Sequence, residues 1–329
     1  MAANLSAQDH ISGVLAGDRV AVARAITLME SSKPDHRALA ATVLAGLLPH
    51  AGASLRVGIS GPPGAGKSTF VEALGMRLVE AGHRVAVLAI DPSSTRTGGS
   101  ILGDKTRMNR LATDPRAFVR PSPSGGTLGG VHRRTRESMR VLEAAGFDVV
   151  LIETVGVGQS EIEVADMVDT FLVLLIGGAG DELQGIKKGI LEVADVLAVN
   201  KADGDKVTLA ELARREIEAA LRFVTPRSKG WTPPVLTCSA VTGDGLAEVW
   251  AGVEAHRAAM TQTGEFDARR KHQRVSWMWA ITRDEVLRAF REDPGVASCV
   301  ERVEANVEAD SESPVAAAEE LLRAWRRSR

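Results

Sequence analysis

The sequence predicts an α/β fold, with a doubly wound and mostly parallel sheet and with helical segments before and after it in the chain. From Leu55 to about Met260, short apolar runs alternate with longer segments of helical periodicity. The apolar runs are rich in Val, Ile and Leu and lack polar alternation, so we expect strands that are covered on both faces. Repeated strand–helix units join through right-handed crossovers, which produces a sheet of this kind.

Six strands are expected within a sheet domain that we place at residues 54–262. These strands are 56–60, 85–90, 149–152, 170–176, 196–200 and 235–238. Residues 1–53 have the clustered apolar positions of helices, with a break at 31–35, and are predicted to form an N-terminal helical extension. Residues 263–329 are predicted to form a C-terminal helical arm, with helices at 264–274, 276–290 and 315–325.

Composition narrows the class of protein. The 329 residues carry a formal net charge of −2, which leaves no global basic field for nucleic acid or an anionic membrane. The two cysteines, Cys238 and Cys299, are too few for a disulfide framework and lack metal-ligand spacing, so a reducing, cytoplasmic location is expected. No secretory signal and no apolar stretch of the roughly 20 residues that span a bilayer is found in the sequence.

A glycine-rich motif, Gly61-x4-Gly66-Lys67-Ser68, follows the first expected strand and opens a helix, as a phosphate-binding P-loop must. The glycines bring backbone N–H groups onto the phosphates. Lys67 supplies a point charge to the β- and γ-phosphates, and Ser68 offers its hydroxyl to Mg²⁺. The alternative, a turn that binds no ligand, is disfavoured by the flanking strand and helix. The residues expected to contact the nucleotide here are Gly61, Pro62, Pro63, Gly64, Ala65, Gly66, Lys67, Ser68 and Thr69.

A second motif, Asn200-Lys201-Ala202-Asp203, ends the fifth expected strand, at the sheet edge where ligands bind in open α/β folds. A carboxylate accepts two hydrogen bonds from adjacent N–H groups, which guanine presents and adenine does not. Asp203 is therefore expected to select GTP and GDP over ATP. Ser239 and Ala240, after the sixth expected strand, are placed to support the guanine carbonyl through backbone N–H groups. A four-residue match alone is more often a surface turn, but its pairing with the P-loop favours the guanine site.

Acidic residues near the P-loop are candidates for organising Mg²⁺. Asp91 ends the second expected strand and Glu153 the third, and one or both should hold the metal or its waters. Asp104 lies in a glycine-rich loop, where a metal-side role competes with that of a solvated acid. Gly156 is expected to place its N–H against the γ-phosphate.

The switch segment departs from the usual GTPase pattern of Asp-x-x-Gly-Gln. Here the acid is Glu153, and no glutamine directly follows Gly156, because Gln159 comes three residues later. Water positioning must then be weak or come from another segment. We expect slow intrinsic GTP hydrolysis that a partner accelerates.

Taken together, these motifs resemble those of the MeaB/ArgK GTPases, which are chaperones associated with methylmalonyl-CoA mutase. The matching segments are residues 61–68, Asp91-Pro-Ser-Ser94, Gly103-Asp-Lys-Thr-Arg-Met108, Glu153-Thr-Val-Gly-Val-Gly-Gln-Ser160 and Asn200-Lys-Ala-Asp203. The resemblance is close over about residues 45–262, and the terminal helices also look like those of the family. It implies a P-loop GTPase fold in which the terminal helices frame a homodimer.

The resemblance also implies a partner and a third switch. The partner is an adenosylcobalamin-dependent methylmalonyl-CoA mutase, for which GTP gates cofactor loading and protection from inactivation. The third switch is residues 177–188, whose glycines predict a mobile loop. Its side chains Gln184, Lys187 and Lys188 are candidates to supply transition-state charge when the partner docks, although any of them can equally be a solvated loop residue.

Two other functions remain open from the sequence, namely a nickel-insertion metallochaperone GTPase and an ATP-driven kinase or transport ATPase. Histidines and cysteines form no clustered motif, which counts against the nickel alternative. The basic run at 269–274 is interpreted as a solvated helix face or a dimer contact rather than a nucleic-acid site, because the total charge is near neutral.

Overall fold

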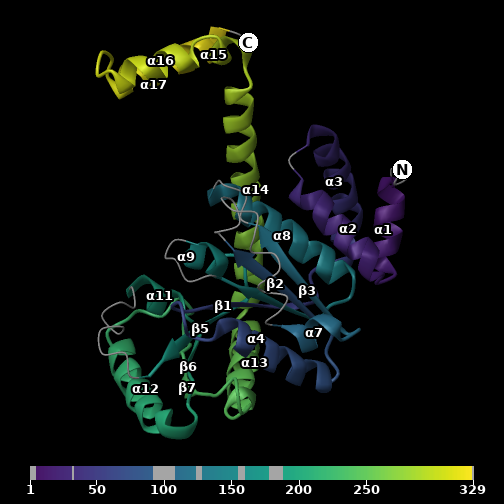
Figure 1. The fold of residues 1–329 in the computed structure, drawn as a ribbon, viewed down its shortest axis with the longest axis vertical. Coiled ribbons are helices and arrows are strands. Elements are labelled where there is room, and N and C mark those ends of the chain that lie inside the picture. Colours follow the sequence, from purple (N-terminus) through teal and green to yellow (C-terminus); the bar gives the residue numbers. More distant parts are fainter. Residues whose placement is uncertain are drawn as a thin grey trace. The chain divides into compact units, whose positions relative to one another are not determined.

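The computed structural model describes residues 5–31, 33–91, 108–123, 128–154, 160–177 and 188–327. It contains two compact units, Met1–Gln273 and Arg274–Arg329. The first unit holds the sheet and the N-terminal helices, and the boundary between the units falls within helix α14 (Glu265–Arg291). Helices and strands carry the labels of Figure 1.

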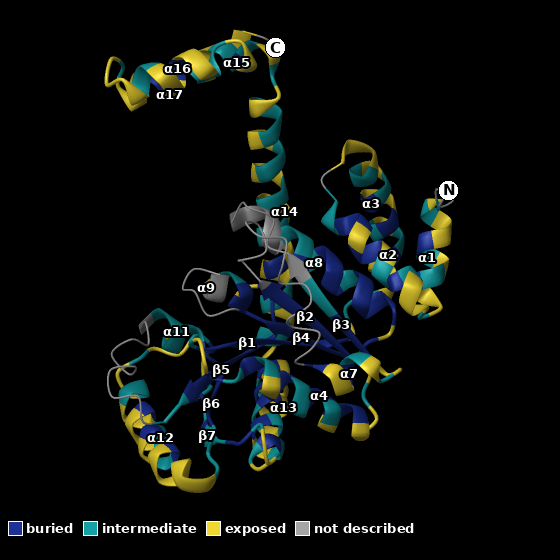
Figure 2. Cartoon of the chain, in the orientation of Figure 1, coloured by how far each residue is buried: buried dark blue, intermediate teal, exposed yellow. Residues whose placement is uncertain are grey.

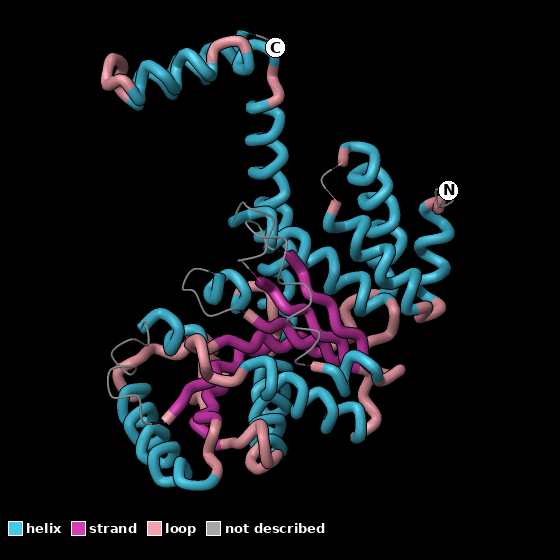
Figure 3. Tube along the Cα trace, viewed as in Figure 1, coloured by secondary structure: helices cyan, strands magenta, loops and turns pink. Residues whose placement is uncertain are grey.

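The sheet has seven strands in the order β3-β2-β4-β1-β5-β6-β7, and every neighbouring pair is parallel. Figure 3 shows the strands in magenta. The predicted doubly wound α/β fold is therefore confirmed. The strands are β1 (Leu55–Ser60), β2 (Val85–Asp91), β3 (Ala117–Pro123), β4 (Val149–Glu153), β5 (Thr170–Ile176), β6 (Val196–Asn200) and β7 (Val235–Thr237).

Six of these strands match the predicted ones to within one residue at either end. Strand β3 was not predicted. Its run contains Arg120, Pro121 and Pro123, which interrupt the apolar pattern. Proline is tolerated there because β3 is an edge strand, where an N–H is not required on the open side.

One face of the sheet is covered by the N-terminal helices together with helices that follow β3, β4, β5 and β6. Their buried side chains form a single apolar cluster with strand residues such as Leu88, Ile152 and Val173. Figure 2 shows most of the central strands in the dark blue of buried residues. The helices on this face are α1 (Ala7–Leu15), α2 (Arg19–Glu30), α3 (Pro34–Leu47), α8 (Leu128–Ala144), α9 (Ser160–Ala165), α11 (Lys188–Val193) and α12 (Val207–Leu221).

The N-terminal helices begin where their sequence supplies caps. Ser6 and Asp9 form a reciprocal capping box at α1, and the carboxylate of Asp18 accepts the Ala21 N–H at the start of α2. Pro34 occupies the first turn of α3, after the predicted break. A single-turn helix, η1 (Leu48–His50), leads toward β1.

The opposite face is covered by α4 (Lys67–Glu80), α7 (Asn109–Thr113) and α13 (Leu246–Thr263). Phe70 and Leu74 of α4 pack in a second apolar cluster with Ile59 and Leu174 of the strands. Both faces of the sheet are buried, as the continuous apolar runs of the sequence predicted. A short turn, η2 (Gly204–Lys206), precedes α12.

The amino edge of the sheet carries a buried network of charged side chains. Asp169 directly precedes β5, and its carboxylate accepts the Arg56 N–H (2.9 Å) and the Arg270 guanidinium (2.8 and 2.6 Å). Asp195 directly precedes β6, and it accepts the Phe171 N–H (3.0 Å) and bonds from Ser228 and Arg269.

Arg269 and Arg270 belong to the basic run that was interpreted as a solvated face or dimer contact. Their side chains are only 12% and 11% exposed, so the interpretation as a solvated face is wrong for these two residues. They fasten the start of α14 to the sheet, and Gln273 adds a bond to the Val168 carbonyl (2.7 Å).

The second unit is helical. It comprises the later part of α14, α15 (Pro294–Ala297), α16 (Val300–Glu308) and α17 (Pro314–Arg327). Phe290 and Trp325 make an edge-to-face contact at 5.6 Å between ring centroids, and Val296 and Val303 are buried. The helices predicted at 264–274 and 276–290 form one continuous helix, because neither glycine nor proline interrupts the sequence from Glu265 to Arg291.

Candidate functional site

A sharp turn joins β1 to α4 at the carboxyl edge of the sheet. Gly61 has φ 149° and Gly66 has φ 81°, both in the region that favours glycine. A Cβ at Gly61 would lie 2.1 Å from the Leu174 carbonyl oxygen, and one at Gly66 would lie 2.9 Å from Asn200 Nδ2. These two glycines therefore allow the loop to lie directly against β5 and β6.

Lys67 opens α4 and is 7% exposed. Its ammonium donates to the carbonyls of Gly61 (2.7 Å) and Pro62 (3.0 Å). The positive charge is thus held over the same loop whose N–H groups are expected to receive phosphate. This arrangement suits an anion better than a neutral ligand, because the start of α4 adds a favourable dipole.

Ser68 and Glu153 meet across the gap between α4 and β4. The Ser68 hydroxyl donates to Glu153 Oε1 at 2.8 Å, and Glu153 is buried at the carboxyl end of its strand. A hydroxyl and a carboxylate are the oxygen donors that Mg²⁺ prefers, so the pair fits this ion. Among the residues that the structure describes, no group of three or more His, Cys, Asp or Glu side chains is arranged to hold a metal.

A second buried contact fixes the chain next to Glu153. The Thr154 hydroxyl donates to Ser60 Oγ (2.9 Å), and the Thr154 N–H donates to the Ile59 carbonyl (3.0 Å). These bonds tie the beginning of the switch segment to the strand that enters the P-loop. Sequence reasoning missed this pair, because each residue alone is an unremarkable polar residue at a strand end.

Several predicted residues lie outside the described part of the chain. Strand β2 ends at Asp91, as expected for a residue near the metal, but its side chain is not among those described. The same holds for the side chain of Lys188, whose backbone begins α11. The other predicted residues that lie wholly outside are Asp104, Gly156, Gln184 and Lys187.

Asn200 joins the two predicted motifs. Its side-chain amide donates to the Ala65 carbonyl of the loop (2.8 Å), and its oxygen accepts the Ala240 N–H (3.0 Å). Asn200 is buried, and the residues it links are 135 and 40 positions away in sequence. The phosphate loop and the segment after β7 are therefore held to one strand end by a single side chain.

Asp203 and Ser239 also meet. The Ser239 hydroxyl donates to Asp203 Oδ1 (2.7 Å) and accepts the Val241 and Thr242 N–H groups at 3.3 and 3.2 Å. Lys201 has φ 63°, a left-handed conformation that is uncommon outside glycine and often marks a functional turn. The geometry brings together four predicted base-site residues, Asn200, Asp203, Ser239 and Ala240.

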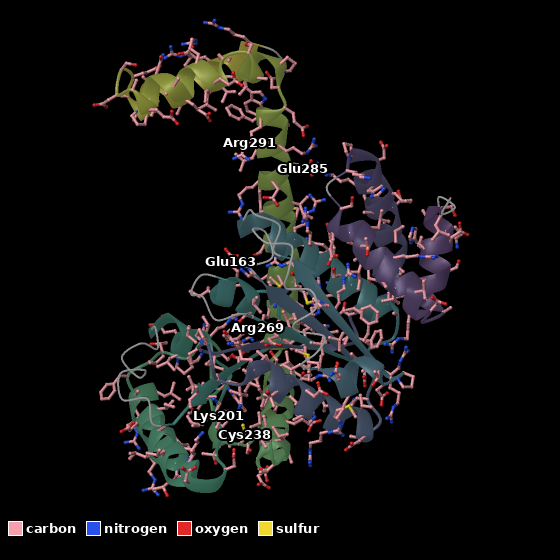
Figure 4. The ribbon with its side chains drawn as sticks, in the orientation of Figure 1. Glu163, Lys201, Cys238, Arg269, Glu285 and Arg291 are labelled. Atoms are coloured by element: carbon pink, nitrogen blue, oxygen red, sulfur yellow. The ribbon has the colours of Figure 1, made fainter. Side chains whose placement is uncertain are left out.

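Cys238 lies beneath this site. Its N–H donates to the Val199 carbonyl and its carbonyl accepts the Ala202 N–H, which pairs the ends of β6 and β7. Lys201 and Cys238 are labelled in Figure 4. Burial raises the pKa of the Cys238 thiol to about 12. The thiol is therefore neutral at physiological pH, and its S–H donates weakly to Asn200 Oδ1 at 3.8 Å.

No helix among the described residues is both long and apolar enough to cross a membrane.

Comparisons with known proteins agree with this geometry. The family model described as methylmalonyl Co-A mutase-associated GTPase MeaB matches residues 22–295. A Mycobacterium tuberculosis protein named as a probable GTPase is 60% identical over 311 residues, which are 94% of this chain and 93% of that protein. The GTPase ArgK of Escherichia coli is 52% identical over 271 residues, 82% of each chain.

More distant relatives cover the chain equally well. The mitochondrial methylmalonic aciduria type A homolog of Mus musculus is 46% identical over 96% of this chain and 78% of its own length. The crystal structure of a LAO/AO transport system kinase has a TM-score of 0.76 at 39% identity, and 98% of each chain is covered. Because the family model spans most of the chain and several relatives exceed 40% identity over most of their length, this chain belongs to the MeaB family of P-loop GTPases.

Proposed function

We propose that this chain binds and hydrolyses GTP with Mg²⁺, as a chaperone for an adenosylcobalamin-dependent methylmalonyl-CoA mutase. The observation that carries the nucleotide part is the double contact of Asn200, which links the phosphate loop to the segment that supports the base. The family description and the names of the relatives support the mutase as client.

Different residues bind different parts of the nucleotide. Backbone N–H groups of residues 61–68 bind the phosphates, and Lys67 exchanges its two carbonyl acceptors for phosphate oxygens. At the other end, Asp203 accepts the two N–H groups of guanine, and its bond from Ser239 orients the carboxylate. Thr69, which follows Ser68 in the first turn of α4, is a further proposed contact to the phosphates.

Ser68 and Glu153 would hold Mg²⁺, whose charge neutralises that of the phosphates. Asp91 and Asp104 are further proposed metal-side residues, and Gly156 a proposed γ-phosphate contact. The glutamate in the switch, with no glutamine directly after Gly156, supports slow intrinsic hydrolysis. Gln184, Lys187 and Lys188 are proposed to supply transition-state charge when the client binds.

Homodimer formation is proposed for the helical second unit. Exposed apolar side chains recur on α14 within this unit, and a second copy would remove them from water. These side chains are Val275, Met278, Trp279, Val286 and Leu287. The domain division at residues 1–53, 54–262 and 263–329 and a cytoplasmic location are proposed with it.

Nucleotide binding and single-turnover hydrolysis test the proposal. The chain should bind GDP and GTP more tightly than ATP, and added mutase should accelerate GTP hydrolysis. Lys67→Ala should reduce hydrolysis by about 10²–10³-fold, because one preorganised donor to the transition state is lost.

Tighter binding of ATP would overturn the guanine assignment, and a rate indifferent to the mutase would overturn the chaperone role. Stoichiometric Ni²⁺ binding by the chelator-treated chain would instead favour the alternative of a metallochaperone for nickel enzymes.

A further inference from the structure

A groove of about 670 Å³ crosses the free edge of the sheet at β3. Helix α2 forms one wall and α7 the other, and β3 forms the floor. Its described lining residues are Arg19, Val20, Ala23, Arg24, Thr27, Asn109, Ala112, Thr113, Phe118, Val119 and Arg120. The groove is separate from the nucleotide site, none of whose predicted residues lines it.

The described lining carries three arginines and no acidic side chain. Arg120 is compensated, since its guanidinium pairs with Glu30 and donates to Thr27 Oγ1. The guanidinium of Arg19 donates to backbone carbonyls of Ala112, Asp114 and Ala117, and its charge also acts on the Asp114 carboxylate, which already pairs with Arg116. Arg24 is exposed and makes no ion pair or hydrogen bond with any described residue. The described lining is therefore net positive, and Arg24 is the described lining arginine that pairs with no described carboxylate.

The spacing of these charges favours an extended chain as ligand. Arg19 and Arg24 are five residues apart on α2, a rise of about 7.5 Å. Alternate residues of an extended strand are separated by about 6.7 Å, which is close to this rise along α2. Between the arginines, Val20 is 57% exposed, and Ala23 offers a further apolar surface.

The groove is connected through α7 to α4, the helix that follows the phosphate loop. Arg19 holds the C-terminal carbonyls of α7, and the N-terminal side of α7 is held by Glu72 of α4, which accepts the Arg110 N–H (2.8 Å). Leu111 of α7 packs on Gly75 of α4, where an added Cβ would lie 2.6 Å from Leu111 Cδ2. A ligand in the groove would thus touch a helix that is fastened to the P-loop helix.

We propose that this groove docks an acidic segment of the client mutase, with carboxylates on alternate residues and an apolar side chain near them. The identity of the client rests on the proposed function. The acidic chemistry of the ligand rests on the groove alone.

The test compares Arg24→Glu with wild type and with Arg222→Glu. Arg222 is also exposed and makes no described ion pair, so it matches the change in charge at a distant position, the C-cap of α12. Arg24→Glu should weaken mutase binding about tenfold, through lost attraction and new repulsion. The difference should shrink in about 1 M NaCl, where the Debye length is about 3 Å. GDP affinity and basal hydrolysis should be unchanged for both variants.

A fluorescent peptide of alternating glutamate and valine provides a second arm that needs no mutase. It should bind wild type and Arg222→Glu and bind Arg24→Glu about tenfold more weakly. If wild type and Arg24→Glu bind the mutase equally, the groove proposal is overturned while the chaperone role stands. If wild type does not bind the mutase, the proposed function fails, and the peptide then decides the groove: no binding, or equal binding to Arg24→Glu, overturns it.

Discussion

The two edges of the sheet use polar side chains in opposite ways. At the carboxyl edge, Ser60, Glu153 and Asn200 end three strands and reach loops or the start of α4. At the amino edge, Asp148, Asp169 and Asp195 each stand directly before a strand and accept an N–H from the neighbouring strand or its approach. The first set holds ligand-binding segments to the sheet, and the second set holds strands to one another.

The difference separates stability from function within one sheet. Asp169 and Asp195 at the amino edge are buried and bound by fixed protein partners, so losing one partner leaves the other uncompensated. At the carboxyl edge, Lys67 donates to two loop carbonyls and Asp203 accepts a bond from a hydroxyl, and a nucleotide can replace or share these bonds. Substitutions at the two edges should therefore have separable effects.

The largest expected effect is that of Asp169→Ala on stability. The change removes the acceptor of both the Arg56 N–H and the Arg270 guanidinium. Breaking a buried ion pair by removing one partner costs about 3–5 kcal/mol, because a buried charge remains. Urea unfolding should report this loss, while the variant that is still folded at low temperature should keep its affinity for GDP.

Asp166→Ala is the matched control. Asp166 also pairs with an arginine, Arg227, but its side chain is 61% exposed, and such pairs contribute about 0–1 kcal/mol. Equal losses of unfolding free energy in the two variants would show that the amino-edge network does not stabilise the sheet.

The sequence predicted the carboxyl edge better than the amino edge, for a physical reason. The P-loop and the segment 200–203 are local patterns, in which the chemistry needs fixed residue types at short spacing. The contact from Asn200 to Ala65 joins residues that are 135 positions apart in the sequence, so only the folded structure reveals it. The amino edge did leave a signal, since Asp148, Asp169 and Asp195 each precede an apolar run, but nothing local indicates their partners.

Sequence pattern also failed to predict the environment of the charged residues of α14 and the presence of the edge strand. Arg269 and Arg270 look like a solvated basic run until the sheet supplies Asp169 and Asp195 as acceptors. Strand β3 looks like a loop because Pro121 interrupts it, and only its edge position makes that proline acceptable. Tertiary partners, rather than local pattern, decide these segments.

A smaller effect is expected at the other edge from Asp203→Asn. An amide offers one acceptor and one donor, so it loses one of the two guanine N–H bonds and meets an N–H with its own. GTP binding should weaken by about 1–3 kcal/mol, and xanthosine triphosphate, which has a carbonyl in place of the guanine amine, should bind better than to wild type. Titration with fluorescent nucleotides measures both affinities.

Asp205→Asn is the control for this change, because Asp205 is exposed in η2 and makes no described contact. The free energy of unfolding should stay within about 1 kcal/mol of wild type in both variants, since the only described side-chain bond of Asp203 is that from Ser239. A large loss of stability in Asp203→Asn, comparable to that of Asp169→Ala, would contradict the separation of the two edges.

The smallest effect concerns the thiol beneath the base site. With a pKa of about 12, the Cys238 thiol should be ionised to only about one part in 10⁴ at pH 8, against about one part in ten at the ordinary value of 9.0. Alkylation by iodoacetamide should therefore be slow at Cys238 and faster at the partly exposed Cys299, as peptide mass spectrometry can measure. GDP should slow Cys238 further by holding the segments that pair around it. Rapid labelling of Cys238 in the native chain would mean that β6 and β7 open at the carboxyl edge, and that the base site is assembled by the nucleotide rather than by the sheet.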